Sequence, residues 1–146
     1  MNDIEIEILL VEDNQDDANL AIRALRKKNL ANKLLHLKDG AEALDFIFGT
    51  GAFEGRGTNF NSKVVLLDLK MPRINGLEVL QRLKSNTQTK MIPVVVLTSS
   101  AEDPDIKTAY ELGANSFIVK PVEFDNFVQT IVDLGMYWVA LNRAPY

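Results

Sequence analysis

Short, mostly apolar segments recur along the chain, and each one is followed by polar residues. Five such segments, rich in Leu, Ile and Val, lie at residues 6–11, 33–37, 64–67, 92–97 and 116–119. Apolar segments of this length are typical of strands that are buried on both faces of a parallel sheet. We therefore predict five β-strands at these positions.

The stretches that follow the strands carry a different pattern, in which apolar residues are spaced by three or four. This spacing predicts helices at residues 15–28, 41–48, 76–83, 104–112 and 124–141. Asn14 and Asp103 are suitable N-cap residues, and Gly113 is a typical helix terminator. The alternation of strands and helices predicts an α/β fold, with helices on both faces of a parallel sheet. The glycine-rich stretch at 49–62 is long for a connection, so we expect a surface loop there.

Composition narrows the class of protein. The chain has 146 residues, 47% of them apolar and 25% charged, which suits one globular domain. It contains no cysteine, so disulfides and thiolate metal sites are excluded. The net charge of −4 disfavours binding to the nucleic-acid backbone, and no apolar run approaches the ~20 residues that span a bilayer. The N-terminus is acidic where a signal peptide would be basic, so we expect a cytoplasmic protein that binds neither nucleic acid nor membrane.

The polar residues that could carry chemistry stand directly after the strands. They are Glu12, Asp13, Asp68, Thr98 and Lys120. All strands of a parallel sheet point the same way, so their carboxyl ends, where such folds bind ligands, should bring these residues to one rim.

Three carboxylates on one rim repel one another unless a cation lies between them. A hard divalent ion with oxygen ligands resolves this conflict, and Mg²⁺ suits a site with one or two carboxylates, a carbonyl and waters. An aspartate beside Mg²⁺ can act as a nucleophile towards phosphorus. Lys120 would supply a positive charge for a phosphoryl oxygen, and the Thr98 hydroxyl could donate to another. We therefore predict that Asp68 is a phosphoryl acceptor.

These motifs resemble the receiver domain of two-component response regulators. The resemblance rests on Glu12-Asp13, on Asp68 with Met71-Pro72 and Asn75-Gly76, on Thr98 and on Lys120-Pro121, and it covers roughly residues 6–134. It implies a flavodoxin-like, doubly wound sheet of five parallel strands in the order 2-1-3-4-5, with five helices. We expect one stand-alone receiver domain over residues 1–146, with a C-terminal helical extension beyond residue 134.

The resemblance also implies a role for each site residue. Asp68 would accept phosphate from a histidine kinase, and Mg²⁺ would be bound by Asp13, Asp68 and the Lys70 carbonyl, with Glu12 acting through water. Lys120 would contact the phosphoryl group across a cis peptide bond to Pro121.

Further residues would respond to the phosphate or tune its lifetime. Thr98 would move towards the phosphate while Phe117 changes rotamer. In this family the positions of Lys70 and Ser100 tune the lifetime of the phosphoryl group.

The loop at 49–57 and the aromatic C-terminal end are similar to those of single-domain regulators that partner phytochromes. In the last helix, apolar residues form two stripes. A helix that is apolar over so much of its circumference is buried on more than one side. We expect one stripe to pack on the sheet and the other to bind a partner, with Phe127, Tyr137 and Trp138 at the interface. This predicts a homodimer through the fourth helix, fifth strand and fifth helix; the alternative is a tail that folds back over its own core.

Two other functions fit parts of the sequence. One is a Mg²⁺-dependent aspartyl-phosphate phosphatase, although Lys70 stands where such enzymes usually carry a second aspartate. The other is an interaction module that works without phosphorylation, against which the complete site argues. His36, the single histidine, lies in a predicted strand and is interpreted as structural.

Overall fold

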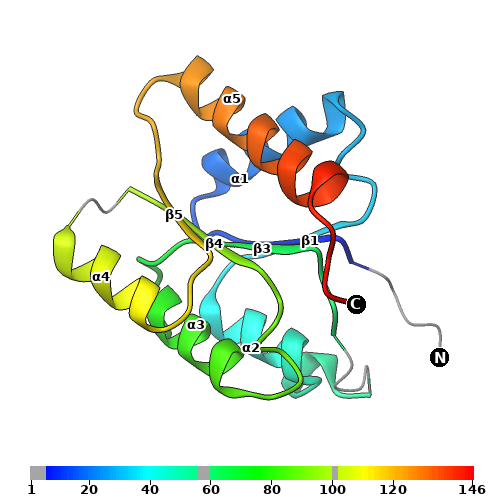
Figure 1. Cartoon of the computed structure of the whole chain (residues 1–146), viewed down its shortest axis with the longest axis vertical. Helices are drawn as coiled ribbons and strands as arrows, with labels where there is room; N and C mark the ends of the chain where they lie inside the picture. The colour runs from blue at the N-terminus through cyan, green and yellow to red at the C-terminus, as the bar shows by residue number, and fades with distance from the viewer. Residues whose placement is uncertain (1–5, 56–59, 100–101) are drawn as a thin grey trace.

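The computed structural model describes residues 6–55, 60–99 and 102–146. Its centre is one parallel sheet with the strand order β2-β1-β3-β4-β5 (Figure 1). The strands are β1 (Ile8–Val11), β2 (Leu34–Leu37), β3 (Val64–Leu67), β4 (Val94–Thr98) and β5 (Ser116–Val119). The predicted flavodoxin-like topology is confirmed.

Helices cover both faces of the sheet. Helices α1 (Gln15–Lys27) and α5 (Phe124–Gly135) lie on one face, and α2 (Gly40–Phe48), α3 (Gly76–Ser85) and α4 (Asp103–Glu111) lie on the other (Figure 1). No helix in this described part of the chain is long and apolar enough to cross a membrane.

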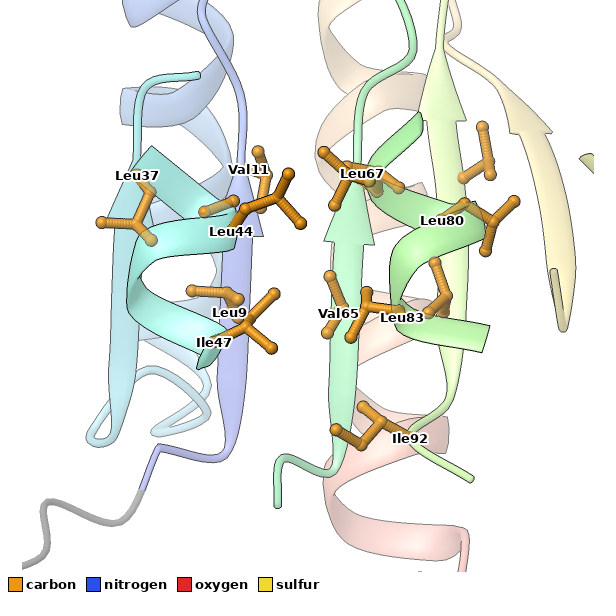
Figure 2. Packing of buried hydrophobic residues seen from close by; sticks show 14 of the residues in the cluster. Leu9, Val11, Leu37, Leu44, Ile47, Val65, Leu67, Leu80, Leu83 and Ile92 are labelled. Atoms are coloured by element: carbon orange, nitrogen blue, oxygen red, sulfur yellow. The ribbon is translucent and has the colours of Figure 1, made fainter. Parts of the chain in front are cut away.

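Side chains of successive residues in the central strands point to opposite faces of the sheet. Figure 2 shows β1 and β3 side chains packed beneath α2 and α3, with Leu9, Val11, Leu37, Leu44, Ile47, Val65, Leu67, Leu80, Leu83 and Ile92 labelled. Their strand neighbours Ile8 and Val64 point to the opposite cluster, beneath α1 and α5. Each fully buried Leu, Ile or Val stabilises the fold by about 1.5–3 kcal/mol relative to exposure. Burial on both faces explains why the central strands are apolar throughout.

Several boundaries differ from the sequence predictions by one or more residues, and three of the differences have a local cause or consequence. Strand β4 begins after Pro93, because proline has no backbone N–H to donate to the ladder. Helix α3 continues to Ser85, whose hydroxyl donates to the Gln81 carbonyl one turn earlier. Helix α4 begins at Asp103, so its N-cap residue is Glu102 rather than Asp103, and Pro104 falls in its first turn as predicted.

The last helix reaches Leu141 as expected, but its end is wound differently. After α5 the chain continues as a π-helix, η2 (Met136–Leu141). The tail then turns back, and Tyr146 donates a hydrogen bond to the Ser62 carbonyl just before β3. The Lys63 ammonium donates to the Val139 carbonyl at 3.2 Å. The tail therefore folds back over its own domain, near the starts of β1 and β3 (Figure 1).

The glycine-rich connection before β3 contains a helical turn and packs on α2. A short 3₁₀ helix, η1 (Gly51–Phe53), follows α2. The Phe46 ring contacts the rings of Phe53 and Phe60 edge-on, with centroids 5.2 and 5.4 Å apart. These aromatic contacts anchor both ends of the connection to α2; residues 56–59 lie outside the described part.

Candidate functional site

Asp68 lies directly after β3 at the carboxyl edge of the sheet, where its backbone N–H donates to the Val11 carbonyl at 3.0 Å. Its side chain is buried, with only 6% of the residue exposed. The chain then turns tightly into α3, since the Gly76 N–H donates to the Leu69 carbonyl at 2.8 Å. A Cβ at Gly76 would lie 2.1 Å from the Asp68 carbonyl oxygen, so only glycine fits this approach.

The end of β1 brings two further carboxylates to Asp68. Oxygen atoms of Glu12, Asp13 and Asp68 all lie within 4.8 Å of one another. Glu12 is buried and Asp13 is exposed. The Glu12 backbone is fixed from β2, because its N–H donates to the Leu37 carbonyl at 3.1 Å and its own carbonyl lies 2.8 Å from the His36 ring nitrogen Nε2. His36 thus has a structural contact, at the base of the acidic cluster.

Lys120 follows β5 and places its ammonium among these carboxylates. Its Nζ lies 2.6 Å from Glu12 Oε1, 3.0 Å from Asp17 Oδ2 and 3.7 Å from Asp68 Oδ2. Its side chain is only 9% exposed. The Lys120 backbone N–H donates to the Thr98 carbonyl at 2.7 Å, which ties the end of β5 to the end of β4.

Burial and charge act together on the pKa values of Glu12 and Lys120. Burial raises the pKa of Glu12 to about 8, the Asp68 carboxylate adds to this rise, and the Lys120 ammonium opposes it. Burial alone would lower the pKa of Lys120, but hydrogen bonds and charges from Glu12, Asp68 and Asp17 outweigh it, and the pKa is raised. Lys120 is therefore held as a cation.

The donor set fits a hard divalent cation. Three carboxylates face a single lysine, so negative charge is in excess when all are ionised. Oxygen ligands of this kind are those that Mg²⁺ and Mn²⁺ prefer. Such an ion would favour the ionised form of each carboxyl group.

The remaining predicted residues lie on the same side of the sheet or next to it. Thr98 is buried at the end of β4. Phe117 in β5 is half-buried against the α2–α3–α4 cluster, and its N–H donates to the Tyr110 hydroxyl of α4 at 3.2 Å. Lys70 lies in the loop after Asp68 and is exposed, and its carbonyl stays a predicted ligand. Ser100 lies outside the described residues.

Two sequence predictions are corrected by the structure. The Lys120–Pro121 peptide bond is trans, since no cis peptide occurs among the described residues. The trans form is favoured before proline by about 0.5–1 kcal/mol, and from it Lys120 already reaches Glu12 and Asp17. Phe127 is 5% exposed within the α1–α5 cluster, so it is a core residue and not part of a partner surface.

Asp17 is a site residue that the sequence reasoning missed. It lies in the first turn of α1, three residues after the N-cap residue Asn14, whereas Asp13 precedes the helix. Because α1 starts at the rim, an aspartate in its first turn is the signal that the sequence offers for a further carboxylate there.

Known proteins match both the sequence and the fold. Residues 8–132 match the family model of the response regulator receiver domain. The probable methanogenesis regulatory protein FilR2 of Methanothrix harundinacea is 39% identical over 138 residues, which cover 94% of this chain and 86% of that protein. Response regulator Rcp1 of Synechocystis is 33% identical over 138 residues, covering 94% and 92% of the two chains.

Solved structures agree. The Mn²⁺-bound form of Rcp1 superposes with a TM-score of 0.87 at 32% identity, over 97% of this chain and 99% of that one. The bacteriophytochrome response regulator RtBRR is 50% identical, with a TM-score of 0.74 over 97% of this chain and 84% of its own. The chain therefore belongs to the response regulator receiver domains, signalling proteins that partner histidine kinases in two-component systems, and its relatives include phytochrome response regulators.

Proposed function

We propose that this chain is a response regulator whose Asp68 accepts a phosphoryl group from a histidine kinase in a Mg²⁺-dependent reaction in the cytoplasm. One observation carries the proposal. A buried Asp68 carboxylate lies 3.7 Å from a lysine ammonium and within one 4.8 Å cluster with Glu12 and Asp13. This arrangement puts a nucleophile, a cation and metal ligands at a single strand end.

In the proposed step, an Asp68 carboxylate oxygen attacks phosphorus, and the P–O bond forms as the P–N bond to the kinase histidine breaks. The Lys120 ammonium offsets the charge of the transferring group, and the Thr98 hydroxyl donates to one of its oxygens. Asp13, Asp68 and the Lys70 carbonyl would hold Mg²⁺, with Glu12 acting through water. The ion supplies charge shielding for the attack.

The signal would leave through α4, β5 and α5. Thr98 ends β4 beside the site, and β5 pairs with β4 from Ser116 to Val119. Phe117 and Tyr110 link β5 to α4 through a hydrogen bond of 3.2 Å. A shift of Thr98 towards the phosphoryl group, with a rotamer change at Phe117, would bias this surface between two states. A homodimer through the same surface is the expected output.

A phytochrome is the kinase class we favour. The relatives that support this are RtBRR and the cyanobacterial phytochrome response regulator RcpA, whose phosphorylated form superposes with a TM-score of 0.86 at 31% identity. Phosphotransfer from a bacteriophytochrome kinase should be much faster than from an unrelated histidine kinase. Equal rates would overturn this choice of partner.

Labelling by acetyl phosphate tests the central proposal. With Mg²⁺, the chain should gain one phosphoryl group, as a mass shift that is lost on treatment with acid or base. Asp68→Asn or EDTA should abolish the labelling, whereas Asp16→Asn, which changes an exposed aspartate, should not. An unlabelled wild type would point instead to an interaction module, and sustained turnover of phosphate esters to a phosphatase.

A further inference from the structure

Asp17 contacts Lys120 at the rim, and this contact has no part in the phosphoryl transfer proposed above. Its Oδ2 accepts a hydrogen bond from Lys120 Nζ at 3.0 Å. Lys120 is thereby held between Asp17 and Glu12, at 3.0 and 2.6 Å, while its distance to Asp68 is 3.7 Å. Among the residues that the structure describes, the cation nearest to the acceptor is therefore bound to two other carboxyl groups and stands beyond hydrogen-bond distance from the acceptor itself.

The position of Asp17 is fixed by the start of α1. Its backbone N–H donates to the side chain of the N-cap residue Asn14 at 3.0 Å, which holds Asp17 in the first turn. The Asp17 side chain is 32% exposed, so it is reached by solvent from one side and contacts Lys120 from the other. Asp16, its neighbour in the same turn, is exposed. The two aspartates therefore offer a comparison in which only one touches the site.

We propose that Asp17 is a positioning residue that retains the Lys120 ammonium and thereby sets how readily Asp68 takes up and keeps a phosphoryl group. The proposal rests on Asp68 being the acceptor. A phosphoryl group on Asp68 brings about two negative charges next to Lys120. To pair with this phosphoryl group, the Lys120 ammonium must move closer to Asp68 than 3.7 Å. Its contact with Asp17 opposes that movement.

Asp17 also acts directly through its charge. Together with Lys120, Ser99 and Phe124, it lines a hollow of about 310 Å³. An anionic phosphoryl donor that approaches Lys120 from this hollow meets the Asp17 carboxylate. Loss of that charge should both free Lys120 and reduce repulsion, while the 2.6 Å contact with Glu12 keeps Lys120 in place.

Kinetics of Asp17→Asn test the proposal. Relative to wild type, we expect a half-saturating acetyl phosphate concentration about three- to tenfold lower and an aspartyl phosphate about three- to tenfold longer-lived, from the loss of one partly screened charge near the site. Asp17→Glu keeps the carboxylate and should stay close to wild type. Asp16→Asn removes the same charge from the same turn and should change either value by less than about twofold, since exposed charges are well screened.

A second measurement separates this inference from the proposed function. In a double-mutant cycle on urea unfolding, Asp17→Asn and Lys120→Gln should shift the midpoint non-additively, because they remove one shared contact. This readout does not need phosphorylation. If wild type is never labelled yet the cycle shows coupling, the acceptor role fails and the contact stands. If wild type is labelled but Asp17→Asn matches Asp16→Asn in both kinetic values, the positioning role is overturned.

Discussion

Gly76 shows how one residue without a side chain sets the position of the acceptor. A Cβ at this position would lie 2.1 Å from the Asp68 carbonyl oxygen and 2.7 Å from Leu69 Cα, and neither backbone atom can move aside cheaply. We predict that Gly76→Ala lowers the free energy of unfolding by about 3 kcal/mol, at the upper end of overpacking costs. Urea unfolding followed by circular dichroism measures this loss.

Gly55→Ala is the matched control for this prediction. A Cβ there meets nothing within 4 Å, and the residue has a φ of +95°. It should cost only the strain of a left-handed conformation, about 1–2 kcal/mol. Equal losses in the two variants would show that close approach to Asp68 is not the reason for glycine at position 76.

Asp39 makes stability depend on pH. The Glu42 backbone N–H donates to its carboxylate at 2.8 Å and, with the nearby Arg73 guanidinium, holds the pKa of Asp39 below its usual range. A lowered folded-state pKa means that the contribution is complete above the unfolded-state pKa of about 4 and is lost as pH falls through the folded-state value.

Asp39→Ala tests this dependence. At pH 7 the variant should be about 1 kcal/mol less stable than wild type, the usual worth of an N-cap. The difference should shrink below about pH 4, as protonation weakens the cap in wild type. Urea midpoints measured from pH 7 down to pH 3 give the comparison, and a constant difference across that range would contradict the electrostatic part of the explanation.

At the scale of elements, the sequence predicts best the helices and strands that a local pattern of residues determines. The five strands are recognisable because each is mostly apolar, and β1, β3, β4 and β5 end at or directly before a polar rim residue. The contacts of Asp17 and His36 were not, since they depend on how α1 and β2 sit beside the rim. The two stripes of the last helix are equally apolar in sequence, so the pattern wrongly predicts Phe127 at the outer surface, whereas packing against α1 buries it. The π-helical end likewise has no distinct periodicity.

The C-terminal tail gives a prediction for a whole segment. Burial raises the pKa of Tyr146 to about 12, and its hydroxyl donates to the Ser62 carbonyl. A raised folded-state pKa means that the docked tail contributes its full stability below about pH 10 and loses it as pH rises towards 12. An ultraviolet titration should therefore contain a tyrosine step near pH 12 that disappears in Tyr146→Phe. An identical curve for the variant would place the Tyr146 hydroxyl in solvent.

At the scale of the whole molecule, the long loop before β3 and the C-terminal segment after α5 contact each other. The loop ends at Ser62 and Lys63, and the C-terminal segment contacts both, through Tyr146 in the tail and Val139 in η2. Lys63 also pairs with Glu7 before β1, at 2.7 Å. Strand β3 thus has the tail contact at its start and Asp68 at its end. The four residues of β3 are fully buried, so they join these two points rigidly.

The surface of α4, β5 and α5, with η2 continuing from α5, keeps the apolar groups that a homodimer would need. Tyr110, Val119 and Tyr137 are 50, 42 and 51% exposed, although all three are large apolar or aromatic residues. Between β5 and the end of α5 lies a hollow of about 580 Å³ whose lining includes Ile118 and Trp138. Exposed aromatic residues around a hollow are typical of association sites.

We predict that wild type associates through this surface and that beryllofluoride with Mg²⁺, a phosphoryl mimic, strengthens the association. Tyr137→Lys should weaken the dimer by about tenfold or more, the usual cost of removing an interface anchor. Met91→Lys is the control, because Met91 is 57% exposed in the turn between α3 and β4, outside this surface. Sedimentation equilibrium measures both. A chain that stays monomeric with and without the mimic would mean that its output surface binds a different protein, because a homodimer would then have no part in the signal.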